Sequence, residues 1–194
     1  MLRALLCSLV LVLAACSSKA EAPTFNSVDV TGADWGRDFN LVATDGKPRR
    51  LADYQEKVVA MFCGYTHCPD VCPTTLTRLR EAMKQLGADA KRVQVLFVTL
   101  DPERDTPELL AQYVPAFDPS FIGLTGTPEA IATTAKDFKV FYQKQPGSSP
   151  EGYTIDHSAG IFVFDPQGRL RLFMRDGEEA AKMAADIKVL LAGK

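Results

Sequence analysis

The sequence predicts an α/β domain whose mixed sheet is flanked by helices on both faces. Between residues 58 and 138, strand-like apolar runs alternate with stretches of helical periodicity. Such alternation indicates parallel crossover connections. Two further apolar runs, residues 161–164 and 170–173, are joined by Asp165-Pro166-Gln167-Gly168, which is typical of a hairpin and adds antiparallel strands. The 194 residues are enough for one well-buried domain and few for two.

The composition is that of an ordinary globular domain. Apolar residues make up 46% of the chain and charged residues 24%, and the formal net charge is −2. There is no dense basic run, so we expect no nucleic-acid partner.

The first residues are expected to direct export. Arg3 precedes an apolar run over residues 4–13 that is too short to span a bilayer, so residues 1–15 are predicted to be a signal peptide. Leu13-Ala14-Ala15-Cys16 resembles the bacterial lipobox, so Cys16 is expected to carry lipid. The alternative is an ordinary signal peptide with a chance cysteine. Lipidation predicts a location in the cell envelope, anchored to a bacterial membrane and facing the periplasm. Residues 16–28 would be the lipidated cysteine and its tether, and residues 29–194 the domain.

The first half of the domain is expected to hold two strand regions and a helix. Residues 39–43 form a strand, a turn follows, and residues 49–51 return as a short hairpin. Residues 58–62 are nearly all apolar, as in a central strand covered on both faces. Residues 73–86 are helical, with Gly87 as a plausible C-cap. Its apolar stripe consists of Leu76, Leu79, Met83 and Leu86.

The second half repeats a clear signal for helix starts. Thr106-Pro107 and Thr127-Pro128 each supply an N-cap threonine followed by proline at the first helical position. Glu178 to Leu191 is predicted to close the chain as a helix. The expected strands and loop are residues 93–100, 121–124 and 140–142 as strands, and residues 145–152 as an exposed loop.

This order of elements is a thioredoxin-like plan, and it places a pair of cysteines where ligands collect. Cys68 and Cys72 follow the strand at residues 58–62 and precede the next helix, at the carboxyl end of the strand. A helix N-terminus favours the thiolate form of a cysteine. Three cysteines within ten residues, Cys63 included, do not make a disulfide framework for a domain of this size. With three intervening residues, Cys68 and Cys72 can form a disulfide or converge on a soft metal such as Cu(I) or zinc.

The third metal ligand is expected to be His157. It precedes the strand at residues 161–164, and in a thioredoxin-like fold this segment faces the cysteine loop. A cis-proline normally occurs there; in this chain Ala159 falls near that place. Asp156 could orient the imidazole. The alternative is a loop histidine bonded only to backbone.

Three neighbours of the cysteine pair have lesser expected roles. His67 is awkwardly placed to bind a metal beside Cys68, so we interpret it as a loop or outer residue. Cys63 is expected to pack in the core. Asp70 could raise the pKa of the thiols or help dock a partner, or it could serve only as an acidic residue at the helix start.

The motifs together resemble the Sco/SenC family. They are Gly64-Tyr65-Thr66-His67-Cys68-Pro69-Asp70-Val71-Cys72-Pro73, Asp101-Pro102-Glu103-Arg104-Asp105-Thr106-Pro107 and Asp156-His157-Ser158, and the resemblance runs from Trp35 to Gly177. It implies a membrane-anchored thioredoxin-like domain that binds copper, as Cu(I), Cu(II) or both, through Cys68, Cys72 and His157. It also implies a role in assembling the CuA centre of cytochrome c oxidase, by delivering copper, by reducing the target cysteines, or both. The implied partners are the CuA-bearing subunit of a respiratory oxidase and a periplasmic thiol reductant or copper donor.

One residue departs from the family pattern. Cys63 stands where the resemblance leads us to expect phenylalanine, close enough in sequence to Cys68 to suggest an alternative thiol partner.

Other functions remain open from the sequence. A thiol–disulfide oxidoreductase would use Cys68 to attack and Cys72 to resolve, without a metal, so whether the chain is an enzyme is undecided, with a metallochaperone favoured. A redox or copper sensor is a third possibility. Structural zinc is disfavoured, because three ligands are evident and structural zinc sites usually have four.

Overall fold

An eight-stranded mixed sheet forms the centre of the computed structural model, which describes residues 23–147 and 152–193. The strand order is β1-β10-β9-β4-β5-β6-β2-β3. The central pairs β4–β5 and β5–β6 are parallel, whereas β9 runs antiparallel to β4 and β10 antiparallel to β9. The strands are β1 (Val28–Asp29), β2 (Leu41–Ala43), β3 (Pro48–Arg49), β4 (Val58–Gly64), β5 (Val93–Thr99), β6 (Ile122–Thr125), β9 (Gly160–Phe164) and β10 (Leu170–Arg175).

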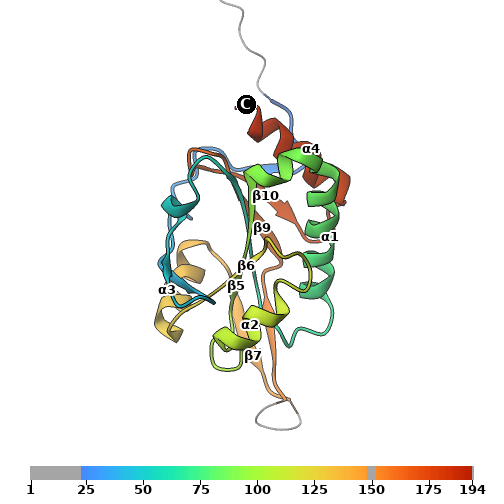
Figure 1. The fold of residues 1–194 in the computed structure, drawn as a ribbon. Helices are drawn as coiled ribbons and strands as arrows, with labels where there is room; N and C mark the ends of the chain where they lie inside the picture. The colour runs from blue at the N-terminus through green and yellow to red at the C-terminus, as the bar shows by residue number, and fades with distance from the viewer. Residues whose placement is uncertain (1–22, 148–151, 194) are drawn as a thin grey trace, which may run out of the picture.

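Helices cover both faces of this sheet, so the predicted thioredoxin-like mixed sheet is confirmed. Helices α1 and α4 lie on one side and α3 on the other (Figure 1). The helices are α1 (Val71–Leu86), α2 (Pro107–Tyr113), α3 (Pro128–Asp137) and α4 (Ala180–Leu191), and short 3-10 segments are η1 (Leu51–Tyr54) and η2 (Gly87–Arg92).

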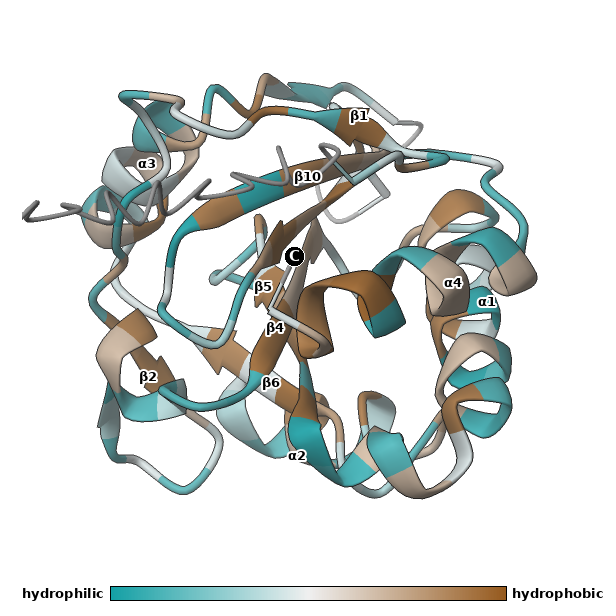
Figure 2. Cartoon of the chain, turned by 90° about the horizontal axis from the view of Figure 1, so that it is seen from above, coloured by the Kyte–Doolittle hydropathy of each residue, from teal (hydrophilic) through white to brown (hydrophobic). Residues whose placement is uncertain are grey.

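Strand β4 separates two apolar cores. Its side chains alternate between them: Phe62 packs with α1 and α4, whereas Met61 and Cys63 pack with α3 and β2. The hydrophobic colouring of the central strands in Figure 2 reflects this burial on both faces. Met61 and Phe62 are fully buried, and burial of such a side chain stabilises the fold by about 1.5–3 kcal/mol. The strand that leads into the cysteine loop is therefore rigidly held.

Both predicted helix starts are confirmed. The Thr106 hydroxyl accepts a hydrogen bond from the Leu109 amide, and the Thr127 hydroxyl accepts one from the Ala130 amide. Helix α1 begins at Val71, two positions earlier than predicted, because Pro73 fits within its first turn.

The predictions around residues 140–157 need correction. The chain forms a small antiparallel sheet of β7 (Tyr142–Gln145) and β8 (Thr154–His157), where the sequence indicated a strand at 140–142 and a loop from 145. His157 thus ends a strand instead of lying in a loop. The two strands form a hairpin that extends beyond the main sheet, at the end remote from the C-terminus (Figure 1). Residues 148–151 of the predicted loop lie outside the described residues.

Two smaller departures occur near the N-terminus. Leu51 begins the 3-10 segment η1 and is not part of the returning strand, which is β3. Contacts to the domain begin before residue 29: the amides of Asn26 and Ser27 donate hydrogen bonds to the buried Asp186 carboxylate on α4. The predicted signal peptide and Cys16 lie outside the described residues. Within the described part of the chain, no helix has the length and apolar character needed to cross a membrane.

Candidate metal centre

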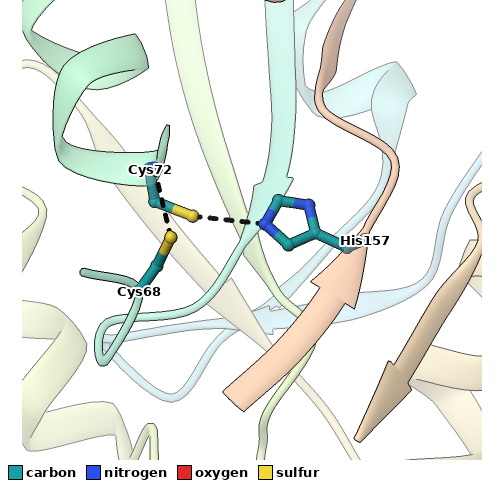
Figure 3. A group of neighbouring side chains, drawn as sticks. All are labelled: Cys68, Cys72 and His157. Carbon is teal, nitrogen blue, oxygen red and sulfur yellow. Dashed lines mark hydrogen bonds between the residues drawn. The ribbon is translucent and has the colours of Figure 1, made fainter. Parts of the chain in front are cut away.

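Cys68 and Cys72 lie together where β4 passes into α1. Cys72 is on the first turn of α1 and fully buried, whereas Cys68 is in the preceding loop and half-buried. The Cys72 amide donates a hydrogen bond to Cys68 Sγ over 3.4 Å (Figure 3). Amides at a helix N-terminus have no partner within the helix, so this one is available to a thiol or thiolate. Both thiols are free.

The close approach of β4 to Cys72 requires a glycine. A Cβ atom on Gly64 would lie 2.7 Å from Cys72 Sγ and 3.1 Å from the rings of Phe62 and Phe97. Any larger residue at position 64 would displace the Cys72 side chain. The end of the strand therefore fixes where the buried sulfur lies.

His157 reaches the same point from the hairpin. Its Nε2 is 3.4 Å from Cys72 Sγ, and the potential ligand atoms of Cys68, Cys72 and His157 all lie within 4.8 Å of one another (Figure 3). Its Nδ1 lies 3.1 Å from the backbone oxygen of Ser158. A carbonyl only accepts, so Nδ1 carries the proton and Nε2 presents its lone pair to the sulfurs. The imidazole thus bonds to backbone through one nitrogen and faces the cysteines with the other.

Burial keeps both groups uncharged in the metal-free protein. Desolvation lowers the pKa of His157 below its ordinary value, so the imidazole is neutral at pH 7. Desolvation raises the pKa of Cys72 far above that of a free thiol, so Cys72 is protonated. For Cys72, burial therefore outweighs the thiolate-favouring helix N-terminus that the sequence suggested. The neutral Cys72 thiol can donate a hydrogen bond to Nε2 of the neutral His157 ring.

The chemistry of the donor set fits a soft, low-coordinate metal ion. Two sulfurs and one imidazole suit Cu(I), which prefers soft ligands. Deprotonation of the thiols would supply negative charge to a buried cation. The site opens into a groove of about 460 Å³ beside Cys68. The groove is lined by Tyr65, Cys68, Pro69, Asp70, Val71, Thr154, Ile155, Asp156, His157 and Ala159.

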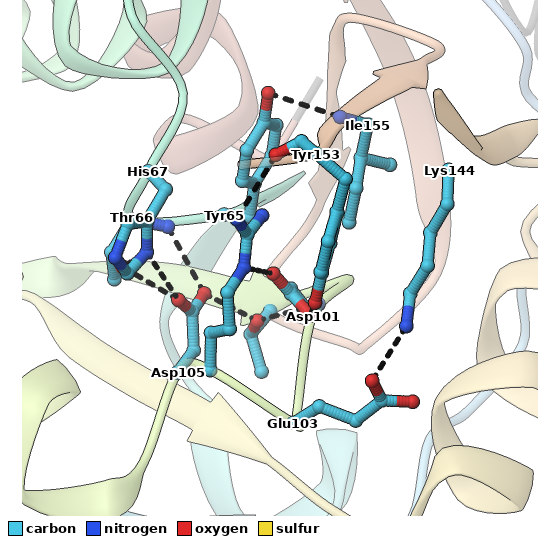
Figure 4. A network of polar contacts seen from close by, with 11 residues as sticks. Tyr65, Thr66, His67, Asp101, Glu103, Asp105, Lys144, Tyr153 and Ile155 are labelled. Atoms are coloured by element: carbon cyan, nitrogen blue, oxygen red, sulfur yellow. Dashed lines mark hydrogen bonds and ion pairs between the residues drawn. The ribbon is translucent and has the colours of Figure 1, made fainter. Parts of the chain in front are cut away.

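Asp105, to which the sequence assigned no role, holds the cysteine loop in place. This fully buried carboxylate accepts hydrogen bonds from the Thr66 amide at 3.0 Å and the Thr66 hydroxyl, and from the Thr99 hydroxyl at 2.6 Å (Figure 4). Asp105 belongs to the motif at residues 101–107, but no local pattern in the sequence marks it as a buried acceptor. Its partner in the loop is 39 positions away, so sequence spacing could not reveal the contact.

Asp156 and Cys63 are neighbours of the ligand set in sequence, but their side chains point away from it. The Asp156 carboxylate accepts a hydrogen bond from Gln145 Nε2 at 2.7 Å, so the backbone oxygen of Ser158, and not Asp156, orients the imidazole. Cys63 is buried in the core on the opposite face of the sheet from Cys72, and burial raises the pKa of its thiol to about 12. Its core packing agrees with expectation, but this placement makes it unsuited to act as an alternative thiol partner.

The other residues near the cysteines fill outer positions. The His67 ring is half-exposed and lies 3.0 Å from the Thr66 hydroxyl, outside the group formed by the two thiols and His157. Asp70 occupies the N-cap position of α1 without a side-chain bond to a helix amide, and it lines the groove. Ala159 also lines the groove, and the described residues contain no cis peptide bond.

Comparison with known proteins identifies the family. The family model described as SCO1/SenC matches residues 28–192. Mouse "Protein SCO2 homolog, mitochondrial" is 36% identical over 153 residues, which is 78% of this chain and 60% of that protein. The human protein of the same name is 39% identical over 133 residues, or 68% of this chain and 50% of that protein. The chain thus spans between half and three-fifths of the length of these relatives.

Two solved structures are similar to this chain in both fold and sequence. Bradyrhizobium japonicum ScoI with copper bound has a TM-score of 0.73 and 38% identity, covering 79% of this chain and 98% of that one. Apo Sco1 of Thermus thermophilus has a TM-score of 0.78 and 44% identity, covering 87% and 98% respectively. The chain therefore belongs to the SCO1/SenC family.

Proposed function

We propose that this SCO1/SenC family member binds copper through Cys68, Cys72 and His157 and serves the assembly of cytochrome c oxidase. The observation that carries the proposal is the convergence of the three side chains within 4.8 Å of one another. The relatives support it, since B. japonicum ScoI has been solved with copper bound.

The exposure of the three residues suggests how cargo would enter and leave. Cys72 is fully buried, while Cys68 and His157 are partly exposed beside the groove. Binding requires the Cys72 thiol to lose its proton, because metals bind the thiolate. A recipient's ligands could approach from the groove and displace Cys68 and His157 before the buried sulfur. The recipient would be the CuA-bearing subunit of a respiratory oxidase, and copper would come from a donor protein.

Thiol reduction is the second candidate, favoured by the unequal exposure of the cysteines. The Cys68 thiolate would attack a target disulfide, forming a mixed disulfide and releasing one target thiolate. Cys72 would then attack Cys68 Sγ, releasing the second target thiolate and leaving a Cys68–Cys72 disulfide. A periplasmic thiol reductant would restore the dithiol.

The N-terminal pattern supports a location in the cell envelope. Removal of residues 1–15 and lipidation of Cys16 would leave a tether up to Asn26, whose amide bonds to the domain, and would anchor the domain to a bacterial membrane, facing the periplasm. The described N-terminal segment leaves the domain at the end remote from the β7–β8 hairpin (Figure 1). An anchor on that segment would leave the groove accessible to partners.

Copper titration of the reduced full chain tests the proposal. One tight equivalent is expected, lost in the Cys68→Ser/Cys72→Ser variant and weakened in His157→Ala. Cys63→Ala is the matched control, since it removes a neighbouring thiol on the opposite face of the sheet. Weak binding that is indifferent to His157, together with intact disulfide reduction, would instead favour the dithiol oxidoreductase.

A further inference from the structure

The hairpin that carries His157 is attached to the domain largely through side chains. Strands β7 and β8 pair with each other in a sheet separate from the main one. The amide of Ile155 in β8 donates its hydrogen bond to Tyr65 Oη, at 3.1 Å, instead of to another strand. The position of His157 therefore depends on contacts that individual residues supply.

One of these contacts is a group of three residues, Asp101, Arg104 and Tyr153, at the start of β8. Arg104 Nε donates to the fully buried carboxylate of Asp101, and its Nη1 donates to the backbone oxygen of Tyr153 at 3.0 Å. The guanidinium carbon lies 3.5 Å from the centre of the Tyr153 ring, a close cation–π contact. Tyr153 Oη completes the group by donating to Asp101 at 2.7 Å (Figure 4).

The same short turn holds the other ligand-bearing segment. Asp105, four residues after Asp101, accepts hydrogen bonds from the amide and hydroxyl of Thr66 in the cysteine loop. The Thr99 hydroxyl joins the two ends of the turn, because it donates to Asp105 and accepts from the Asp101 amide at 2.9 Å. The turn at residues 101–105 therefore contacts both the cysteine loop and the histidine hairpin.

We propose that Arg104 and Tyr153 are positioning residues that set the distance between His157 and the dithiol, and so control how strongly the imidazole binds copper. The inference rests on the proposed copper function and extends it to residues that do not touch the metal. A planar guanidinium can stack on a ring and donate to two acceptors at once, which lysine cannot. Without this group the β7–β8 pairing would remain, but the imidazole would no longer be held at the sulfurs.

Tyr153 is the better residue to change first. Removal of Arg104 would leave the buried Asp101 carboxylate without its cation and could unfold the protein. Tyr153→Leu keeps the Arg104–Asp101 pair and removes the ring and its hydroxyl. Tyr153→Phe keeps the ring and loses one hydrogen bond, so it should retain most of the wild-type copper affinity. Glu103→Gln is the matched control, because it breaks the exposed ion pair that joins the same turn to Lys144 of the hairpin and leaves in place Lys144, whose Nζ lies 4.7 Å from the centre of the Tyr153 ring.

A double-mutant cycle with His157→Ala tests the proposal. We expect Tyr153→Leu to weaken Cu(I) binding about tenfold, as loss of outer contacts does at metal sites, and to diminish the imidazole-nitrogen coupling in the Cu(II) spectrum. In the His157→Ala background, Tyr153→Leu should change the affinity no further. An equal loss in both backgrounds, or no change in affinity and spectrum, would overturn the proposal.

A metal-free readout separates this inference from the proposed function. In the reduced chain without copper, NMR should show nuclear Overhauser contacts between the His157 ring and Cys72, whose Nε2 and Sγ are 3.4 Å apart. Tyr153→Leu should lose these contacts and Glu103→Gln should keep them. If the wild-type chain bound no copper, the proposed function would fail while this result still decided the positioning role. Contacts that persist in Tyr153→Leu would contradict it.

Discussion

The cysteine loop and the histidine hairpin supply the same site by different means. Cys68 and Cys72 lie on a continuous stretch between a fully buried strand and a helix that packs on the core. His157 ends a separate two-stranded sheet, held in place by side chains from a distant turn. The dithiol is therefore as stable as the fold, whereas the imidazole can be adjusted by small changes outside the core.

This difference suggests a division of work within the proposed function. The buried Cys72 would retain the metal, and His157 would determine how readily it leaves. A substitution can therefore act on the dithiol, on the histidine, or on neither.

The largest effect is expected from Cys72→Ser. It removes a soft ligand, so copper affinity should fall by more than the roughly 10–100-fold typical of outer contacts. Competition with a Cu(I) chelator measures this. Cys63→Ala should keep the full stoichiometry of one copper per chain and lower the stability by about 1 kcal/mol. Equal copper loss in both variants would show that the two faces of the sheet are not distinct.

Gly64→Ala should damage the dithiol through packing. The new methyl group would meet Cys72 Sγ, so we expect a loss of about 1–3 kcal/mol in the free energy of unfolding and weaker copper binding. Chemical denaturation measures the first and chelator competition the second. In a Cys72→Ala background, part of the stability loss should disappear because the clashing sulfur is gone. A full loss in that background would place the strain on the phenylalanine rings instead.

The affinity for copper should depend on pH through Cys72. Its pKa is raised by burial, so the free protein holds this proton at neutral pH and must release it on binding. Affinity should therefore rise with pH, about tenfold per pH unit for each proton released. The pKa of His157 is lowered by burial, so protons should not compete with copper for its imidazole at pH 7. Affinity that is constant between pH 6 and 8 would mean that Cys72 is already a thiolate.

The smallest effect is expected from Glu103→Gln. It breaks the exposed ion pair with Lys144 on the hairpin, and such pairs contribute at most about 1 kcal/mol. Thermal unfolding and copper affinity should both stay near the wild-type values. A clear loss of copper affinity would show that the hairpin depends on its exposed charges as well as on Tyr153.

The sequence predicted these two regions with unequal success, for a physical reason. Strand β4 and helix α1 are long and strongly patterned, so the location of the cysteine pair between them could be inferred from local spacing. Strands β7 and β8 have four residues each, and residue 155 is the buried apolar position among the polar residues of β8, so hydrophobic periodicity gave little signal. His157 was inferred from the expected fold, not from its own strand.

Local sequence patterns also could not predict contacts between residues that are far apart in the sequence. The bonds from Tyr153 to Asp101 and from Thr66 to Asp105 span 52 and 39 positions, and nothing in the spacing distinguishes these acids from exposed ones. From the sequence, Asp156 could orient the imidazole, although adjacency alone did not establish a contact. Neighbours on a strand point to opposite sides. That geometry directs its carboxylate to Gln145 instead.

X-ray absorption spectroscopy of the Cu(I)-loaded full chain can identify the atoms bound to copper. We predict that copper is bound by two sulfur atoms and one imidazole nitrogen, and that His157→Ala loses the nitrogen and retains both sulfurs. A wild-type shell of sulfur alone, unchanged in His157→Ala, would contradict the assignment of His157 as a copper ligand.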